Sequence, residues 1–274
     1  MGRYFPYRMH PLSVAELLHP EVPNDVVRAP KPIANAAFEA LWSHGGYPEP
    51  FLKRDRRFSS RWRRQRTELL VREDVREVAA IQDLSRLEAL VVILDERSSK
   101  PVVYSNLAED LQVSVDTVRR WIDVLARLGH GFLVRPWSRR IAKAIRKEPK
   151  WYSADWSGVA DLGGRAETAI AGHLLKAVDT WTDLGFGRFE VRYLRDKAGR
   201  EVDFAVIRDG RPWMLVETKL SDMQLSSALD YFQRQTGAPH AFQAVWQADH
   251  VDADCFSRTK PTVVPARTLL SQLV

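Results

Sequence analysis

The segments Gly199-Arg-Glu-Val-Asp-Phe-Ala-Val-Ile207 and Trp213-Met-Leu-Val-Glu-Thr-Lys219 decide the fold of the second half of this chain. Each segment has the composition of a β-strand, and Asp209-Gly210 between them is a favoured hairpin dipeptide. The pattern therefore predicts two adjacent antiparallel strands. Because Trp213-Met-Leu-Val216 is a continuous apolar run, we expect the second strand to lie in the middle of a sheet.

Charged side chains stand at one end of this predicted hairpin. Since side chains alternate between the two faces of a strand, Val202 and Phe204 are expected on one face and Asp203 on the other. Glu217 and Lys219 share a face of the second strand. A register that sets Asp203 opposite Glu217 would bring two carboxylates and one ammonium together.

These charges predict a metal site. Two adjacent carboxylates repel each other unless a cation neutralises them, and oxygen ligands favour Mg²⁺ or Mn²⁺, here bound to Asp203 and Glu217. Such an ion would lower the pKa of a bound water and stabilise charge on a phosphoryl oxygen, while Lys219 orients that water. The arrangement resembles the metal-binding core of the PD-(D/E)xK nucleases. In the alternative interpretation, Glu217 and Lys219 are surface charges that pair with each other.

The composition narrows the class of protein. At 274 residues the chain suits about two domains. The 41 Lys and Arg residues against 35 Asp and Glu give a net charge of +6, which is compatible with a nucleic acid partner without requiring one. The single cysteine, Cys255, excludes an intramolecular disulfide, so a reducing cytoplasm is the simplest location. Neither a signal peptide nor a membrane-spanning apolar run is present, and we expect no membrane contact.

Two basic segments are candidates for contact with phosphates. The first covers residues 53–66 and contributes Arg61, Arg63 and Arg64. The second contributes Arg139, Arg140 and Lys143. The alternative for the first segment is a solvated helix whose Phe58 and Trp62 pack inward.

Residues 103–128 have the pattern of a helix-turn-helix, and 132–134 would form the strand of a wing. Ser105 or Asn106 would cap the first helix, Ser114 would cap the second, and Gly129 would end it. The outer face of the second helix carries Asp116, Thr117, Arg119, Arg120 and Asp123. In a DNA-binding protein this face enters the major groove, with both arginines on the DNA. Otherwise the face is solvated or docks on another domain.

The second half of the chain has a regular order of elements. We expect a helix over 166–183 with Glu167 in its first turn, strands over 188–194 and in the hairpin, a helix over 225–235 and a strand over 241–246. The order α-β-β-β-α-β is that of the restriction-endonuclease-like core, a mixed sheet with helices on both faces. The expected fold class is therefore α+β or α/β, in which a helical and winged helix-turn-helix part precedes this domain. We place the boundaries at 1–95, 96–160 and 161–274.

Several motifs resemble, in the same order, the C-terminal part of prokaryotic AAA-type ATPases. The shared tail of those ATPases is a domain of unknown function with a nuclease-like fold. The matching segments are 4–13, 45–50, 70–74, the helix-turn-helix, 136–139, Glu201-Val-Asp203-Phe and Glu217-x-Lys219. Thr218 departs from the apolar residue that is usual within Glu-x-Lys.

The resemblance has three implications. Glu167 matches an acidic position of the tail and would support the metal or its water. Residues 1–95 would be a remnant of the ATPase core and lid with a helical linker. The Walker A and Walker B strands of those ATPases belong upstream of Met1, so the resemblance implies no ATP binding by this chain alone, and an ATPase domain or another protein as a partner.

Three functions are therefore open. The first is Mg²⁺- or Mn²⁺-dependent hydrolysis of phosphodiesters, with DNA as the expected partner and RNA left open; its catalytic residues would be Asp203, Glu217, Lys219 and Glu167. The second is a catalytically inactive DNA-binding or protein-interaction module that regulates an AAA-type ATPase. The third is a transcription regulator, against which the two acidic residues of the recognition face argue.

Overall fold

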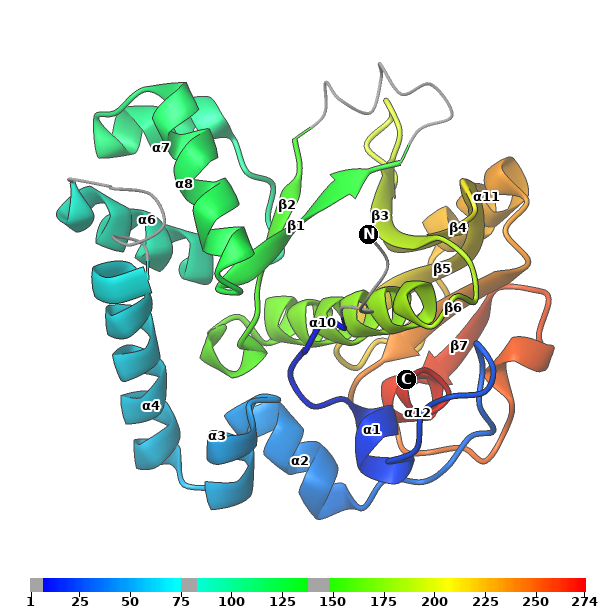
Figure 1. The fold of residues 1–274 in the computed structure, drawn as a ribbon. Coiled ribbons are helices and arrows are strands. Elements are labelled where there is room, and N and C mark those ends of the chain that lie inside the picture. Colours follow the sequence, from blue (N-terminus) through cyan, green and yellow to red (C-terminus); the bar gives the residue numbers. More distant parts are fainter. Residues whose placement is uncertain (1–6, 75–82, 138–147) are drawn as a thin grey trace, which may run out of the picture.

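The structure of the protein, a computed structural model, describes residues 7–74, 83–137 and 148–274. Helices predominate in the first half of the chain, and a seven-stranded mixed sheet occupies most of the second half (Figure 1). This mixed architecture confirms the coarse fold class expected from the sequence. Across the described residues, no helix has both the length and the apolar character needed to cross a membrane.

Four short helices form the first part of the chain. They are α1 (Val14–Leu18), α2 (Asn35–His44), α3 (Pro48–Lys53) and α4 (Arg56–Leu69), and a π-helical turn (Leu70–Asp74) continues α4. Side-chain caps fix two of the helix starts, because the Glu16 amide donates to Ser13 and the Phe58 amide donates to Asp55. The inner faces of α1 and α2 then pack on the main hydrophobic core.

A second helical group follows, with its own hydrophobic core. It consists of α6 (Leu84–Glu96), α7 (Tyr104–Leu111) and α8 (Val115–Arg127). As predicted, Ser114 caps α8 by accepting from the Thr117 amide, and Gly129 follows the helix with a φ of 71°. The predicted cap of the preceding helix is wrong, because α7 starts at Tyr104 and has no side-chain cap.

The strands form one sheet in the order β2-β1-β3-β4-β5-β6-β7. Their bounds are β1 (Gly131–Pro136), β2 (Lys150–Ser153), β3 (Phe189–Arg195), β4 (Glu201–Arg208), β5 (Arg211–Lys219), β6 (His240–Val245) and β7 (Thr262–Pro265). The pairs β1–β2, β3–β4 and β4–β5 are antiparallel, and the other three pairs are parallel. Asp209 and Gly210 form the predicted hairpin turn with φ values of 50° and 81°.

Helices cover both faces of the sheet (Figure 1). The long helix α10 (Leu162–Asp183) packs on the face that carries Phe204 and Val216, and α11 (Ser227–Thr236) packs on the face that carries Ala205 and Leu215. The order from α10 to β6 is α-β-β-β-α-β, as expected. Strand β7 and the C-terminal helix α12 (Ala266–Ser271) extend this order and were not predicted. Two short 3₁₀ turns lie at Trp156–Gly158 and Cys255–Ser257.

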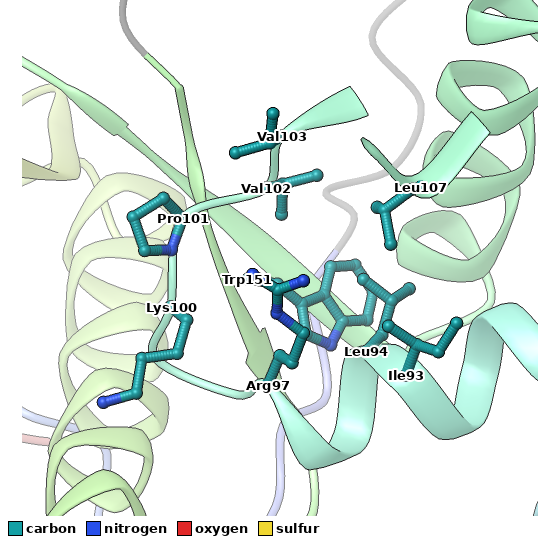
Figure 2. Close-up of a pocket in the computed structure, with 9 residues that line it drawn as sticks. All are labelled: Ile93, Leu94, Arg97, Lys100, Pro101, Val102, Val103, Leu107 and Trp151. Atoms are coloured by element: carbon teal, nitrogen blue, oxygen red, sulfur yellow. The ribbon is translucent and has the colours of Figure 1, made fainter. Parts of the chain in front are cut away.

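Strand β2 joins the second helical group to the sheet. Trp151 is 1% exposed and belongs to the core of that helical group, whereas its neighbour Tyr152 belongs to the core under α10. Figure 2 shows Trp151 beside Leu94 and Leu107 at a cavity of about 10 Å³. That volume is far below what a small-molecule site needs, so we assign Trp151 to packing. The boundary expected at residue 160 thus separates strands of one sheet.

Candidate functional site

The hairpin β4–β5 brings Asp203 and Glu217 next to each other, in the register considered above. Phe204 pairs with Val216, so Asp203 and Glu217 are the next residues along the two strands. The Thr218 amide donates a hydrogen bond of 2.8 Å to Oδ2 of Asp203. The backbone of β5 therefore fixes the orientation of this carboxylate.

A β-bulge corrects one detail of the expected strand pattern. Arg192 of β3 pairs with Ala205, but Leu194 pairs with Val202, so β4 has one extra residue between these pairs. Because of this residue, Val202 packs with Ala205 in the core under α11. The expectation that Val202 and Phe204 share a face is wrong. At this bulge the Asp203 side chain reaches Lys150, whose ammonium is 3.7 Å from its Oδ1.

Glu217 has one paired and one unpaired carboxylate oxygen. Its Oε1 lies 2.9 Å from the Lys219 ammonium, whereas Oε2 is buried without a hydrogen-bond partner. Burial, and then the charge of Asp203, raise the pKa of Glu217 to about 7 against the opposing effects of Lys219 and of the Asp203 backbone N–H. Burial also raises the pKa of Asp203. A buried oxygen of this kind favours the presence of a proton or a cation.

Glu167, in the first part of α10, lies in a second group of charges. The Lys150 ammonium is 3.1 Å from Oε1 of Glu167 and 2.6 Å from Oε1 of Glu201. It is 3.7 Å from Oδ1 of Asp203, which links this group to the hairpin. The Tyr152 hydroxyl donates a 2.7 Å hydrogen bond to the same oxygen of Glu167.

The protonation of Glu167 results from opposing effects. Burial is the main cause that raises its pKa to about 7, and the charge of Asp203 adds to this effect. Lys150 and Tyr152 oppose it. For Lys150, burial acts to lower the pKa, but the surrounding carboxylates outweigh burial and raise it. Lys150 therefore carries its charge throughout the neutral range.

Three residues of this cluster were not among the predicted site residues, namely Lys150, Tyr152 and Glu201. In the sequence, Lys150 belongs to a basic segment, and its carboxylate partners lie far along the chain. One signal was present: Lys150 directly precedes the large apolar residues Trp151 and Tyr152 of a short strand. A lysine on a buried strand requires a charged partner.

The donor set fits a magnesium or manganese ion that is bound by two carboxylates. Asp203 and Glu217 provide oxygen ligands, and the unpaired Oε2 of Glu217 is buried at this point. Magnesium is commonly held by one or two carboxylates and completed by water and substrate phosphates. Within residues 7–74, 83–137 and 148–274, no group of three His, Cys, Asp or Glu side chains is arranged as a metal site.

The predicted nucleic-acid contacts have different environments. Arg119 and Arg120 are exposed on α8, and Arg61 and Arg64 are exposed on α4. Arg63 instead lies 3.1 Å from Oδ2 of Asp155, and it holds α4 against the segment after β2. The other predicted contacts, Arg139, Arg140 and Lys143, lie outside the described residues.

The aromatic side chains of α4 agree with the alternative interpretation of this segment. The ring of Trp62 lies 5.0 Å from that of Tyr47, and the guanidinium of Arg66 stacks 4.4 Å from the Tyr47 ring. Phe58 is partly buried. One face of α4 is therefore used for packing, and the opposite face presents Arg61 and Arg64 to solvent.

The chain is similar to proteins that are themselves uncharacterised. A family described as a domain of unknown function (DUF8612) matches residues 35–167, a segment that ends before Asp203. The uncharacterised proteins Mb2031c of Mycobacterium bovis and Rv2008c of Mycobacterium tuberculosis are each 22% identical to the chain over 204 residues. This alignment covers 72% of the chain and 46% of each relative, so the chain spans less than half of their length. No solved structure gives a significant match.

Proposed function

We propose that this chain is a nucleic-acid-associated protein whose PD-(D/E)xK-like site hydrolyses phosphodiester bonds with Mg²⁺ or Mn²⁺. The observation that carries the proposal is the buried, unpaired Oε2 of Glu217 beside Asp203 and Lys219. Two carboxylates and a lysine at the end of adjacent strands form the donor set that this chemistry needs. The element order from α10 to β6, with helices on both faces, supports a restriction-endonuclease-like core.

Each residue of the site has a distinct role in this proposal. Asp203 and Glu217 would hold the ion, and the Thr218 amide already orients Asp203. When bound, the ion would lower the pKa of a water molecule and neutralise charge on a phosphoryl oxygen. Lys219, with 34% of its side chain exposed, would position that water from the solvent side. Glu167 would support the hydration of the ion from α10.

The same proposal assigns nucleic acid binding to the helical part of the chain. The pair α7–α8 with the antiparallel strands β1 and β2 supports a winged helix, whose second helix presents Arg119 and Arg120 to solvent. Arg61 and Arg64 on α4 provide further exposed charge for phosphates. We take DNA as the partner and include RNA in the test.

The decisive experiment measures cleavage of single-stranded DNA, double-stranded DNA and RNA with Mg²⁺, with Mn²⁺ and with EDTA. The main variant is Asp203→Asn, because Asn removes the charge and keeps an oxygen for the Thr218 amide. We expect a loss of roughly 100-fold or more, since even changes around the ligands of a metal site reduce activity 10–100-fold. Asp230→Asn, which removes an exposed carboxylate on α11, is the matched control. If purified Asp203→Asn cleaves nucleic acid at the rate of the wild type, the proposed mechanism is contradicted.

One observation favours a second function, binding without cleavage. Lys219 already pairs with Glu217 at 2.9 Å, so the hairpin charges are partly neutralised by the protein itself. A binding module would retain DNA or a partner protein, and Mn²⁺ would leave its unfolding temperature unchanged. A metal-dependent enzyme would be stabilised by Mn²⁺, because the ion binds only the folded chain.

We also propose that the chain functions as the C-terminal part of a longer AAA-type ATPase. The support beyond the motif resemblance is that the relatives extend well beyond the matched segment, which covers 46% of their length. The test is the coding sequence upstream of Met1. An in-frame Gly-x-x-x-x-Gly-Lys-Ser/Thr motif would support this proposal, and its absence would contradict it.

A further inference from the structure

Lys150 is an internal cation of the carboxylate cluster. Its side chain is 5% exposed, and its ammonium lies between 2.6 and 3.7 Å from oxygens of Glu167, Glu201 and Asp203. A buried ammonium is stable only when carboxylates surround it in this way. The lysine comes from β2, whereas its partners come from α10 and β4. Lys150 is therefore built into the cluster from a different part of the fold.

Asp203 lies between this internal cation and the proposed metal position. Its Oδ1 faces the Lys150 ammonium at 3.7 Å, and its Oδ2 accepts the Thr218 amide beside Glu217. Phosphodiester enzymes with two metal ions place the ions about 3.5–4 Å apart, on both sides of such carboxylates. Here an ammonium stands on one of the two sides.

We infer that Lys150 takes the place of a second divalent ion, so that the site binds a single divalent cation, at Asp203 and Glu217. The inference rests on the proposed function, because it specifies how the same site binds metal. The ammonium lies within 3.7 Å of one oxygen of each of the three carboxylates around it, so a divalent ion on that side would have to displace it or bind next to its charge. The ion that remains would be completed by water and substrate phosphates.

The neighbours of Lys150 hold the ammonium in this position. Trp151 fills the core of the second helical group (Figure 2), and the Tyr152 hydroxyl is bound to Glu167. The ring of Tyr193 lies 5.7 Å from the ammonium. Because alternate residues of β2 are anchored on opposite faces, Lys150 cannot turn toward solvent without disrupting the packing of Trp151. A divalent ion would therefore have to compete with an ammonium group that cannot move away.

The test counts the Mn²⁺ ions bound per chain near neutral pH without nucleic acid, from the electron paramagnetic resonance signal of free Mn²⁺. We expect one ion on the wild type and two on Lys150→Met, which removes the charge and retains an unbranched side chain. Lys150→Arg retains a cation and should bind one ion. Lys197→Met, which removes an exposed lysine from the turn before β4, should also bind one. Asp203→Asn should lose the ion.

The outcomes separate this inference from the proposed function. Two ions on the wild type, or an unchanged count and affinity on folded Lys150→Met, would overturn the inference even if the wild type cleaves DNA. If Lys150→Met binds an ion and the wild type binds none, the role of Lys150 is supported and metal-dependent hydrolysis by the wild type is contradicted. No ion on either protein would contradict both. If Lys150→Met does not fold, the count on the wild type and Lys150→Arg decides: one ion supports the inference, and two overturn it.

Discussion

The Tyr152 hydroxyl and the Lys150 ammonium contact the same carboxylate oxygen, Oε1 of Glu167, at 2.7 Å and 3.1 Å. Both contacts favour the ionised form of Glu167, whereas burial favours the protonated form and raises its pKa to about 7. The contribution of the Tyr152 hydrogen bond to the stability of the fold therefore depends on pH. Above that pKa the hydroxyl stabilises a buried charge, and below it the hydroxyl meets a neutral group.

Tyr152→Phe should lower the free energy of unfolding by about 1–2 kcal/mol at a pH well above 7 and by clearly less well below 7. Urea unfolding followed by circular dichroism at the two pH values measures the difference. Tyr193→Phe is the control, because the Tyr193 hydroxyl donates a bond of equal length, 2.7 Å, to the backbone carbonyl of Glu148. An equal loss for Tyr152→Phe at both pH values would contradict the coupling to Glu167.

Glu217→Gln should remove part of the pH dependence of stability. The pKa of Glu217 is raised from 4.5 to about 7 in the folded protein. Between these values the folded chain binds more protons than the unfolded chain, so the free energy of unfolding falls as pH rises. Gln keeps the shape of the neutral form at every pH. We expect a flatter profile and a gain of about 1–3 kcal/mol above pH 7, reduced by whatever the Lys219 pair contributes.

Chemical denaturation across this pH range checks the prediction. The control is Glu190→Gln, which removes a carboxylate that pairs with Arg192 outside the cluster and should leave the slope unchanged. A slope for Glu217→Gln that equals that of the wild type would show that Glu217 does not carry the excess proton.

Local patterns explain which parts of the site the sequence could predict. Asp209-Gly210 specifies the hairpin turn, but the pairing next to this turn would by itself set Asp203 opposite Val216. A register shift of one residue between the pairs Ile207–Pro212 and Val206–Met214 brings Asp203 beside Glu217. Ser114 likewise specifies the start of α8. The turn and the cap depend on residues close together in the chain, so a single sequence is sufficient to predict them.

The other half of the cluster depends on contacts that no local pattern specifies. Lys150 reaches the carboxylates because β1 joins the sheet through two pairs with β3, Arg135 with Arg192 and Pro136 with Tyr193. That parallel pairing connects distant segments, and basic residues precede Lys150 in the sequence as in an ordinary solvated stretch. The bulge at Asp203 is equally hidden, since strict alternation is the rule that a bulge breaks.

Trp151→Phe and Trp156→Phe should differ in their effect on stability although both indoles are buried. Nε1 of Trp151 is buried without a partner, whereas Nε1 of Trp156 donates a 2.7 Å hydrogen bond to the Leu41 carbonyl. Phe removes a hydrogen bond only in the second case, where the Leu41 carbonyl keeps the Gly45 amide as its partner, and this loss should add about 0.5–1.5 kcal/mol. Thermal unfolding of the two variants makes the comparison, and equal losses would contradict it.

Ala variants of the neighbours Arg63 and Arg64 on α4 should distinguish an arginine that stabilises the fold from one that contacts nucleic acid. Arg63 pairs with Asp155, which is only 9% exposed, and donates a 2.8 Å hydrogen bond to Ser157. Arg63→Ala leaves Asp155 short of a partner and should lower stability by roughly 1–3 kcal/mol. Arg64→Ala removes an exposed charge and should leave stability unchanged.

For DNA binding we expect the opposite, namely a larger effect of Arg64→Ala than of Arg63→Ala. If Arg64 on α4 and Arg120 on α8 contact phosphates, each Ala variant should weaken binding equally for all sequences and reduce the salt dependence of log K by roughly one unit. Fluorescence anisotropy with a labelled duplex at several salt concentrations measures this slope. Glu109→Ala, an exposed change on α7, is the control that should not weaken binding. If both arginine variants have the same slope as the wild type, α4 and α8 do not contact the phosphates, because counterion release depends on the number of phosphates neutralised.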